Sequence, residues 1–356
     1  GTVDITGAGT LLKFWGDGAS GLYVGNGGTG TVSVSDGGRL ESNDAFIGNN
    51  ASGVGTLAVA GSGSEWNGYG NVVVGNSGRG TVEVENGAKA NNTTLSVGVN
   101  SGATGSAVLS GAGSEWNVYD TIVLGGLAGG GGTGGTGTLS VLSGGTMNSS
   151  NLLVGQAATS TGTATVSGSG SKLQLSATLR AGISGTGTVD VAAGGVVTAD
   201  NAILGINASG DGTLSITDSG SGVTLTNRMT VAALGAGALN IANNGRLQSN
   251  GGIIGRDAGS DGTVRVSTGG TWENTSNLTV GADGTGVMTV SAGGIVNNRT
   301  AVIGDSATGN GTVTVSGTGS VWTNVGGLTV AAGGTGTLAI EAGGQVVSTA
   351  SSVAAA

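Results

Sequence analysis

The chain of 356 residues contains 80 Gly, no Pro, no Cys and no His, and its formal net charge is −9. The acidic balance and the scatter of the 11 Lys and Arg exclude the basic surface that nucleic acids require, and the lack of Cys and His excludes disulfides and the commonest metal ligands. No apolar run is long enough to span a membrane. Hydrophobic residues still make up 37% of the chain, enough for a core if their pattern is ordered.

A short apolar run that ends in Gly recurs along the chain, as LYVG at 22–25, VVVG at 72–75 and LSVG at 95–98. The last residues of these runs, the anchors, are separated by 23 and 27 residues in alternation, with one spacing of 26 and one of 30. The spacing of 30 is a short unit to which GGLAGGGGTGGTG (125–137) adds seven residues. Internal repetition of this kind indicates a solenoid. We therefore expect 1–356 to be a single repeat domain of about 13–14 coils, with a loop insertion at 125–137.

Each repeat contains two further strand patterns. The segment GTVSVSDGG (30–38) alternates strictly, so that Val32 and Val34 face one side of a strand. A third short run follows the Gly pair, as in RLES (39–42). Three short strands per coil, Gly-rich corners and no helical periodicity predict an all-β, right-handed parallel β-helix whose coils alternate between about 23 and 27 residues.

The Gly-Ser tracts GSGSEWN (61–67) and GAGSEWN (111–117) are interpreted as corners that precede the third strand of the longer coils. Trp66 and Trp116 bracket Ala90, a large–small–large succession that keeps the interior volume near constant. The alternative is that the tryptophans form a carbohydrate-stacking platform. The predicted core stack takes one apolar residue from each coil: Leu40, Trp66, Ala90, Trp116, Met147, Leu173, Val197, Val223, Leu247, Trp272, Val296, Trp322 and Val346.

The middle residue of each anchor strand should point outward, because its two neighbours point inward. These residues make a partly apolar stripe, and contiguous exposed apolar surface often marks an interaction site. The alternatives are ordinary β-propensity on a ladder surface and cover by a flanking loop. The predicted interaction stripe consists of Tyr23, Phe46, Val73, Val123, Leu153, Ile203, Ile253 and Val302.

The 20 Asp and Glu are spread mostly one per coil, in turns. A polysaccharide lyase or hydrolase needs convergent carboxylates or a Lys or Arg base on one face, so this scatter predicts no catalytic residue and no enzyme activity. Asp257 and Asp261 share one turn with Arg256, where we expect a solvated corner. We assign no cofactor and no metal-binding residue, with Ca²⁺ in such acidic turns as the alternative.

The two ends of the chain fall at different points of the repeat. GTVDITGAG (1–9) aligns with GTLAVAGSG (55–63), and SVAAA (352–356) lies where the first strand of a further coil belongs. We expect both ends to be open, as in a segment of a longer array. The alternative is a pair of complementary ends that join head to tail into fibres.

The unit W-N-x3-N-x-V-V-G, followed by G-T-V-x-V, L-x-V-G and V-x-S-G-x-G-S-x-W, resembles a repeat shared by passengers of bacterial autotransporters (type V secretion) and by some exported PEP-CTERM proteins. The match is strongest at 45–124 and 252–335 and weakens at 156–251, where Leu173 and Val223 stand in place of Trp. The resemblance implies an exported, surface-displayed right-handed β-helix, often the stalk of an adhesin.

These observations predict a non-enzymatic module that is extracellular or on the outer surface of a bacterium. The leading hypothesis is the passenger or stalk of an autotransporter-type adhesin, a rigid rod for surface attachment. The alternatives are a self-assembling extracellular filament or matrix protein and, more remotely, a polysaccharide-active enzyme. The expected partners are a host or neighbouring cell surface, a glycan or matrix component, or further copies of the chain.

Overall fold

The computed structural model describes residues 1–14 and 21–353. Within them all 38 regular elements are β-strands, so these residues hold no helix that is long and apolar enough to cross a membrane. The chain divides into two compact units: unit 1 holds Gly1–Ser176 with Gly185–Gly187, and unit 2 holds Ala177–Ser184 with Thr188–Ala356. Each unit is a parallel β-solenoid with its own core, which confirms the predicted all-β, parallel β-helical fold class.

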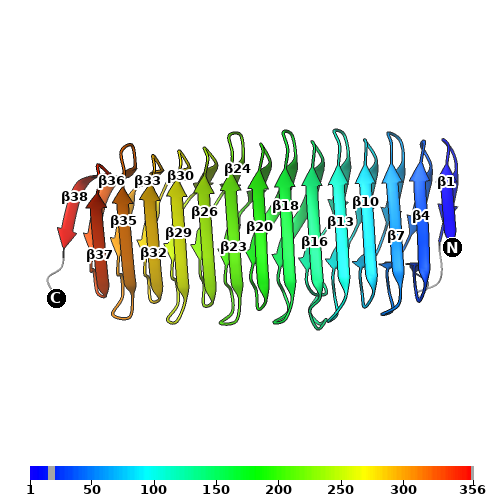
Figure 1. Ribbon diagram of the computed structural model, residues 1–356, viewed down its shortest axis with the longest axis horizontal. Helices are drawn as coiled ribbons and strands as arrows, with labels where there is room; N and C mark the ends of the chain where they lie inside the picture. Colours follow the sequence, from blue (N-terminus) through cyan, green and yellow to red (C-terminus); the bar gives the residue numbers. More distant parts are fainter. Residues whose placement is uncertain (15–20, 354–356) are drawn as a thin grey trace. The chain divides into compact units, whose positions relative to one another are not determined.

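The first parallel sheet of unit 1 contains one strand from each turn, and these strands lie side by side (Figure 1). Their side chains alternate between the core and the outer face, because successive residues of a strand point to opposite sides. In β10, for example, Val82 and Val84 are buried whereas Glu83 and Glu85 are half-buried. The sheet contains β1 (Thr2–Thr6), β4 (Thr29–Ser35), β7 (Val54–Ala60), β10 (Arg79–Glu85), β13 (Thr104–Ser110), β16 (Thr136–Leu142) and β18 (Thr161–Ser167).

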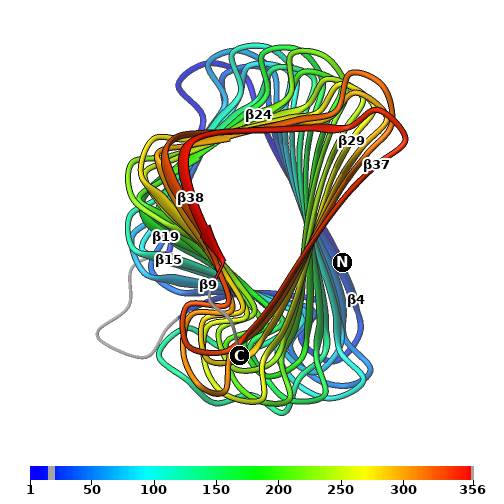
Figure 2. The ribbon, with the colours of Figure 1, turned by 90° about the vertical axis from the view of Figure 1, so that its left-hand side faces the viewer.

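The strands of the second sheet of unit 1 face this sheet across the interior (Figure 2). Most turns contribute two short strands to the second sheet, and in β17 and β19 the two are joined into one longer strand. They are β2 (Leu11–Lys13), β3 (Leu22–Val24), β5 (Arg39–Ser42), β6 (Ala45–Ile47), β8 (Glu65–Gly68), β9 (Asn71–Val74), β11 (Lys89–Asn92), β12 (Thr94–Val97), β14 (Glu115–Val118), β15 (Thr121–Leu124), β17 (Thr146–Val154) and β19 (Lys172–Ala181), the last of which ends in unit 2.

Unit 2 repeats the same arrangement. Its first sheet contains β20 (Thr186–Ala192), β23 (Asp211–Thr217), β26 (Ala236–Ala242), β29 (Asp261–Ser267), β32 (Thr285–Ser291), β35 (Asn310–Ser316) and β37 (Thr335–Glu341). Its second sheet contains β21 (Val196–Ala199), β22 (Asn201–Leu204), β24 (Gly222–Leu225), β25 (Met229–Val231), β27 (Arg246–Ser249), β28 (Gly252–Ile254), β30 (Thr271–Asn274), β31 (Asn277–Val280), β33 (Ile295–Asn298), β34 (Thr300–Ile303), β36 (Val321–Val330) and β38 (Gln345–Val353).

Strand register follows the spacing of the sequence repeat. Leu22 pairs with Ala45 and Ala45 pairs with Val72, offsets of 23 and 27 residues. The anchor Gly25 ends the strand that begins at Leu22 and has a φ of 67°. An added Cβ there would come within 2.2 Å of the Val54 carbonyl oxygen of the next turn. The anchor position of Gly25 therefore requires glycine for two reasons: its backbone is left-handed, and the neighbouring turn leaves no space for a Cβ.

Members of the predicted core stack occupy one register position in successive turns. Leu40 pairs with Trp66, and Ala90 pairs with both Trp66 and Trp116. Every member in both units is at most 1% exposed, except Val346. Val346 is half-buried because its strand has a neighbouring turn on one side only within the described residues. The large side chains of the stack are therefore the centre of each unit.

The Gly-Ser tracts form corners, and the serine directly before the Glu of each tract bonds to a neighbouring turn. The Ser64 hydroxyl accepts a hydrogen bond from the N–H of Gly37 (3.1 Å), and the Ser114 hydroxyl accepts one from Gly87 (2.9 Å). Each bond joins two successive turns and satisfies a backbone donor beside the core. Equivalent serines, all buried, bond to the glycines of preceding turns at Ser171, Ser221 and Ser320.

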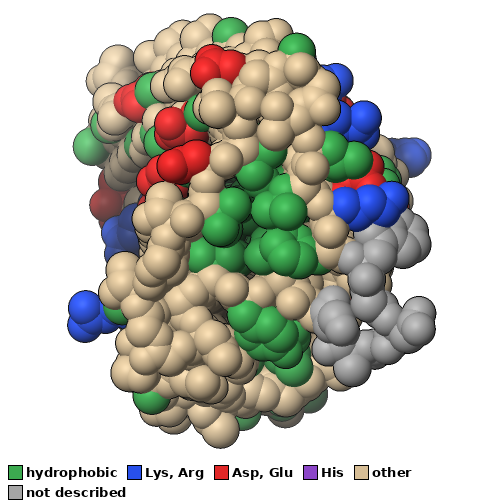
Figure 3. Space-filling model, turned by 90° about the vertical axis from the view of Figure 1, so that its right-hand side faces the viewer, with side chains coloured by type: hydrophobic (Ala, Val, Ile, Leu, Met, Phe, Trp, Pro, Cys, Tyr) green, Lys and Arg blue, Asp and Glu red, His purple; other side chains and the backbone are tan. Residues whose placement is uncertain are grey.

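The terminal turns are more exposed than the others. Figure 3 shows hydrophobic side chains in the middle of the end face of unit 1 that carries β1. Val3 is 42% and Leu11 51% exposed, because this turn has one neighbouring turn among the described residues. In unit 2, Ser352 pairs with Thr329, at the anchor-strand position that the repeat predicts. Residues 354–356 of the SVAAA segment lie outside the described residues.

Candidate functional site

The predicted interaction stripe forms one register column in unit 1. Tyr23 pairs with Phe46, and Phe46 pairs with Val73. The rings of Tyr23 and Phe46 are stacked, with centroids 5.0 Å apart and planes 11° apart. Tyr23 is 47% exposed, and both Phe46 and Leu153 are half-buried. An aromatic pair is therefore accessible at the first turns of unit 1.

The prediction of an exposed stripe is wrong at Val73 and Val123, which are 3% and 0% exposed. Ser96 lies between them in the column and is 1% exposed. Its hydroxyl accepts a hydrogen bond from the N–H of Ala128 (3.0 Å), so the insertion at 125–137 lies against this part of the column. Cover by a flanking loop, the alternative interpretation of the stripe, accounts for the burial around Ser96.

The stripe in unit 2 is weakly apolar. Ile203, Ile253 and Val302 are half-buried, and threonines stand between them in the column. One of these, Thr230, is 4% exposed. The column in unit 2 consequently lacks a contiguous exposed apolar patch of the kind that marks a docking surface.

The tryptophans of the described residues are core residues, so the alternative of a tryptophan stacking platform is wrong. Each is 0% exposed, and each indole N–H finds a buried acceptor one turn earlier. Trp116 Nε1 donates to Asn92 Oδ1 (2.6 Å), and Trp66 Nε1 donates to Ser42 Oγ (3.2 Å). These buried polar partners were missed from the sequence, although a Ser or Asn about one turn before each Trp is the signal. The acceptors in unit 2 are Ser249 and Asn298.

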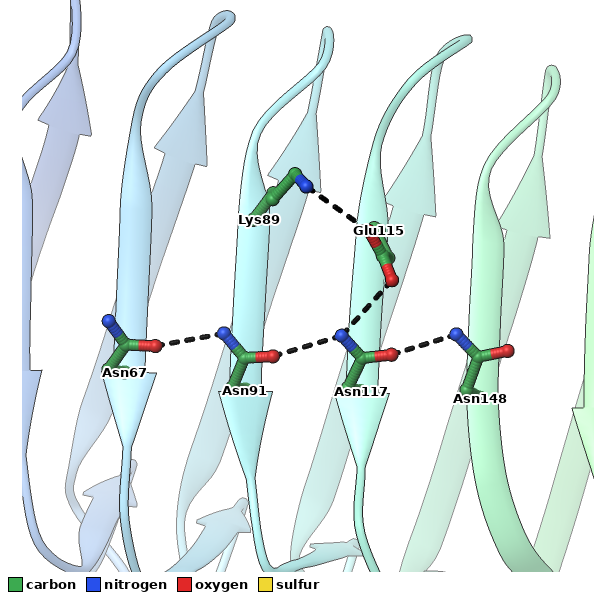
Figure 4. Close-up of polar contacts among 6 residues, drawn as sticks. All are labelled: Asn67, Lys89, Asn91, Glu115, Asn117 and Asn148. Carbon is green, nitrogen blue, oxygen red and sulfur yellow. Dashed lines mark hydrogen bonds and ion pairs between the residues drawn. The ribbon is translucent and has the colours of Figure 1, made fainter.

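A column of asparagines runs along the outer face of the second sheet in unit 1 (Figure 4). Asn67, Asn91, Asn117 and Asn148 each follow a core-stack residue, so their side chains point outward. Nδ2 of each donates to Oδ1 of the previous one, at 2.8, 3.0 and 2.8 Å in chain order. The three bonds run in one direction, which aligns the amide dipoles and strengthens each bond. Two of the four asparagines stand in a Trp-Asn dipeptide and the other two follow Ala90 and Met147, so the sequence signal for this ladder is an Asn directly after a core-stack residue.

Glu115 sets the direction of the ladder. Its Oε1 accepts a hydrogen bond from Asn117 Nδ2 (3.2 Å), and an ionised carboxylate can only accept. Asn117 must therefore turn its nitrogen toward Glu115 and Asn91 and its oxygen toward Asn148. Lys89 Nζ lies 3.4 Å from the other oxygen of Glu115 and forms an ion pair with it (Figure 4). Asn148 Oδ1 is consequently the acceptor at the end of the ladder.

A groove of about 450 Å³ opens at this acceptor end, inside unit 1. Asn117 and Asn148 line it together with Gln174, which follows the core-stack residue Leu173 as Asn148 follows Met147. Tyr119 stands at the corner that follows β14. Tyr119 is 68% exposed. No lining side chain is charged: the rest are Ser, Val and Leu. This combination of amides, hydroxyls and an exposed aromatic ring is suited to a neutral polar ligand.

Unit 2 has hollows of another character. The first has a volume of about 470 Å³ and lies over Gly222, whose lack of a side chain leaves space beside Arg246. The second has a volume of about 460 Å³ and shares the lining residues Thr224 and Gln248 with the first. The second hollow also contains Glu273. These hollows carry charged side chains and no aromatic ring.

The acidic residues do not gather into a reactive centre. Arg256 donates two hydrogen bonds to Asp257, at 3.0 and 2.7 Å, and the hydrogen bond from Arg256 lowers the pKa of the Asp257 carboxyl. The carboxylate offered as an alternative Ca²⁺ ligand is thus engaged by a guanidinium. In the parts of the chain that the structure describes, no three His, Cys, Asp or Glu residues are placed to hold a metal ion.

Comparison with known proteins supports the architecture. No family model matches the chain, and no curated protein matches it. A solved structure, that of a TibA fragment covering its residues 55–350 and hyper-glycosylated by TibC, is similar to the chain over 97% of its length and 99% of the fragment. The TM-score is 0.52 and the sequence identity 20%, so the likeness extends to the fold.

Proposed function

We propose that this chain is a non-enzymatic structural module, displayed outside a bacterial cell as part of an autotransporter-type adhesin passenger. The single observation that carries the proposal is the use of its polar side chains. They bond from one turn to the next, as in the asparagine ladder and the corner serines, rather than converging on a reaction site. The β-solenoid fold that the chain shares with the TibA fragment agrees with such a module.

Two of the carboxylates bond from turn to turn in the same way. Glu85 accepts a hydrogen bond from Ser110 of the next turn (3.0 Å), and Glu273 accepts two from Asn297 (3.0 and 3.1 Å). A hydrolase or lyase needs acidic or basic groups that are free to exchange protons with a substrate. Carboxylates held by neighbouring turns suit a load-bearing surface, and we propose that the module acts without a cofactor.

Attachment of coated beads tests the adhesive role. Beads carrying the purified chain should bind to epithelial cells or to an extracellular-matrix film, and beads carrying the heat-unfolded chain should not. Equal attachment of the two bead types would reject the role. Incubation with neutral and acidic polysaccharides, followed by measurement of new reducing ends and unsaturated products, tests the remaining enzyme hypothesis. Turnover by the purified chain would reject the non-enzymatic proposal.

Lateral self-assembly is the second candidate, and the stacked Tyr23–Phe46 pair favours it. Phe46→Lys should keep the chain monomeric at concentrations at which the unmodified chain forms particles in sedimentation. Ile203→Asp places a charge at the equivalent column in unit 2. Assembly that persists in both variants would exclude the stripe as its contact.

A further inference from the structure

The groove at the end of the asparagine ladder presents hydrogen-bonding groups that the protein does not use. Asn148 Nδ2 donates to Asn117 Oδ1, and Asn148 Oδ1 accepts no hydrogen bond within the described residues. In Figure 4 this oxygen points away from Asn117. The Gln174 amide, on the same groove wall, also has no partner among the described residues. The groove therefore offers an oriented acceptor at Asn148 and, within the described part of the chain, an unpartnered amide at Gln174.

The ladder makes Asn148 Oδ1 a prepared acceptor. The amide cannot turn over without exchanging its nitrogen for an oxygen opposite Asn117 Oδ1, and two carbonyl oxygens repel each other. Aligned bonds upstream polarise the last carbonyl. A ligand hydroxyl that donates to this oxygen thus meets a group that is already oriented, which reduces the entropic cost of binding.

Tyr119 supplies an apolar surface beside these amides. Its backbone is held on both sides, since its N–H donates to Asn92 O (2.9 Å) and its carbonyl accepts from Ser150 Oγ (3.3 Å). Its side chain is 68% exposed. A tyrosine ring combines apolar faces with a polar tip, and a sugar ring likewise has an apolar C–H face and a rim of hydroxyls.

We propose that the groove lined by Asn148, Gln174 and Tyr119 binds a neutral oligosaccharide. The Asn148 oxygen and the Gln174 amide bond to neighbouring hydroxyls, and a sugar ring packs on Tyr119. A neutral ligand fits because the lining carries no charge and because the chain has a net charge of −9, which repels acidic polymers. The inference deepens the adhesive function proposed above, since it assigns the attachment site and its ligand class.

Titration of the full chain with defined sugars tests the inference. The probes are linear neutral tetrasaccharides of glucose, mannose and galactose, and a tetragalacturonate as the acidic comparison, each measured by calorimetry up to about 10 mM. At least one neutral probe should bind, and the tetragalacturonate should not. Tyr119→Ala combined with Gln174→Ala should weaken binding by about tenfold or more.

Tyr69→Ala is the matched control. Tyr69 occupies the corner that follows β8, as Tyr119 does after β14, and is 55% exposed, but it does not line the groove. The control should bind the probe as the unmodified chain does. Circular dichroism and thermal unfolding of all variants should match, because the substituted side chains are exposed.

Three outcomes would overturn the inference: no neutral probe binds, only tetragalacturonate binds, or the double variant keeps its affinity to within tenfold. The bead assay with the same double variant separates this inference from the adhesin proposal. If beads of the double variant attach although the variant no longer binds sugar, the groove is rejected as the attachment site and the adhesive role stands. If the unmodified chain binds sugar but its beads do not attach, the adhesive role is rejected and the sugar site in the groove stands.

Discussion

The indole rings of Trp66 and Trp116 meet across Ala90, with centroids 6.4 Å apart and planes tilted by 56°. Ala90 pairs in register with both tryptophans. Two turns of a parallel sheet are separated by about 9.6 Å, so the rings reach one another only because the residue between them is small. The sequence of volumes along the stack, rather than any single side chain, fills the core of unit 1.

Ala90→Leu should overpack this layer and lower the free energy of unfolding by about 1–3 kcal/mol. The added carbons would occupy the space into which the two indoles tilt. Urea unfolding followed by tryptophan fluorescence measures the change. Ala58→Leu, on the outer face of β7 and half-buried, is the control and should shift the midpoint little; an equal loss in both would contradict the packing account.

Ser64→Ala should destabilise the corner by about 1 kcal/mol, because the N–H of the half-buried Gly37 loses its acceptor. The same Gly-Ser tract provides the control. Ser62 is exposed whereas Ser64 is 1% exposed, so Ser62→Ala should leave stability within about 0.5 kcal/mol of the unmodified chain. Hydrogen exchange at the Gly37 amide reports the local effect. A similar response to both substitutions would rule out the specific bond between turns.

Glu115→Ala should loosen the direction of the asparagine ladder. Without the carboxylate, nothing on β14 requires Asn117 to present Nδ2 on that side. We expect faster exchange of the side-chain amide protons of Asn117 and Asn148 in NMR spectra, with a loss of stability below about 1 kcal/mol because the ion pair with Lys89 is at the surface. Lys89→Met keeps the carboxylate and should preserve the ladder. Unchanged exchange in Glu115→Ala would mean that the ladder orients itself.

The Arg256–Asp257 pair should make a small, acid-sensitive contribution to the stability of unit 2. The hydrogen bond from Arg256 lowers the pKa of Asp257 in the folded chain, so stability is gained above the unfolded pKa of about 4 and lost as the pH falls through the folded pKa. Both side chains are more than a third exposed, which limits the gain to about 1 kcal/mol or less. NMR titration of the Asp257 carboxyl measures the pKa, and Arg256→Ala should return it toward its ordinary value. An unaltered titration in that variant would contradict the pairing.

Several features of the fold could be predicted from the sequence, because the spacing of the sequence repeat equals the offset between residues that pair in neighbouring strands. The offsets of 23 and 27 residues between anchors are those between paired residues such as Leu22, Ala45 and Val72. The alternation of Val with Thr or Ser predicts which side of each strand of the first sheet is buried. Residues at the same position of successive repeats must stack on one another, so the core stack could be predicted from the repeat alone.

The candidate site could not be predicted in the same way. The groove joins Asn117, Asn148 and Gln174 from three turns, and its existence depends on which side chains are absent or small between them. The burial of Ser96, whose hydroxyl accepts a hydrogen bond from the Ala128 N–H, depends on where the insertion at 125–137 folds. A glycine-rich loop carries no periodic signal that fixes its path.

By itself, then, the sequence determined the class of fold, the length of each turn and the inward side of each strand, because these follow from local alternation and a constant period. Only the tertiary structure decided which outward side chains remain available. That depends on neighbours brought together by stacking: the insertion covers Ser96, each tryptophan N–H of the described residues is satisfied by a buried Ser or Asn of the preceding turn, and the ladder leaves the Asn148 oxygen as its free end. Stacking places residues about 25 positions apart within hydrogen-bonding distance, and the chemistry of the surface arises from those contacts.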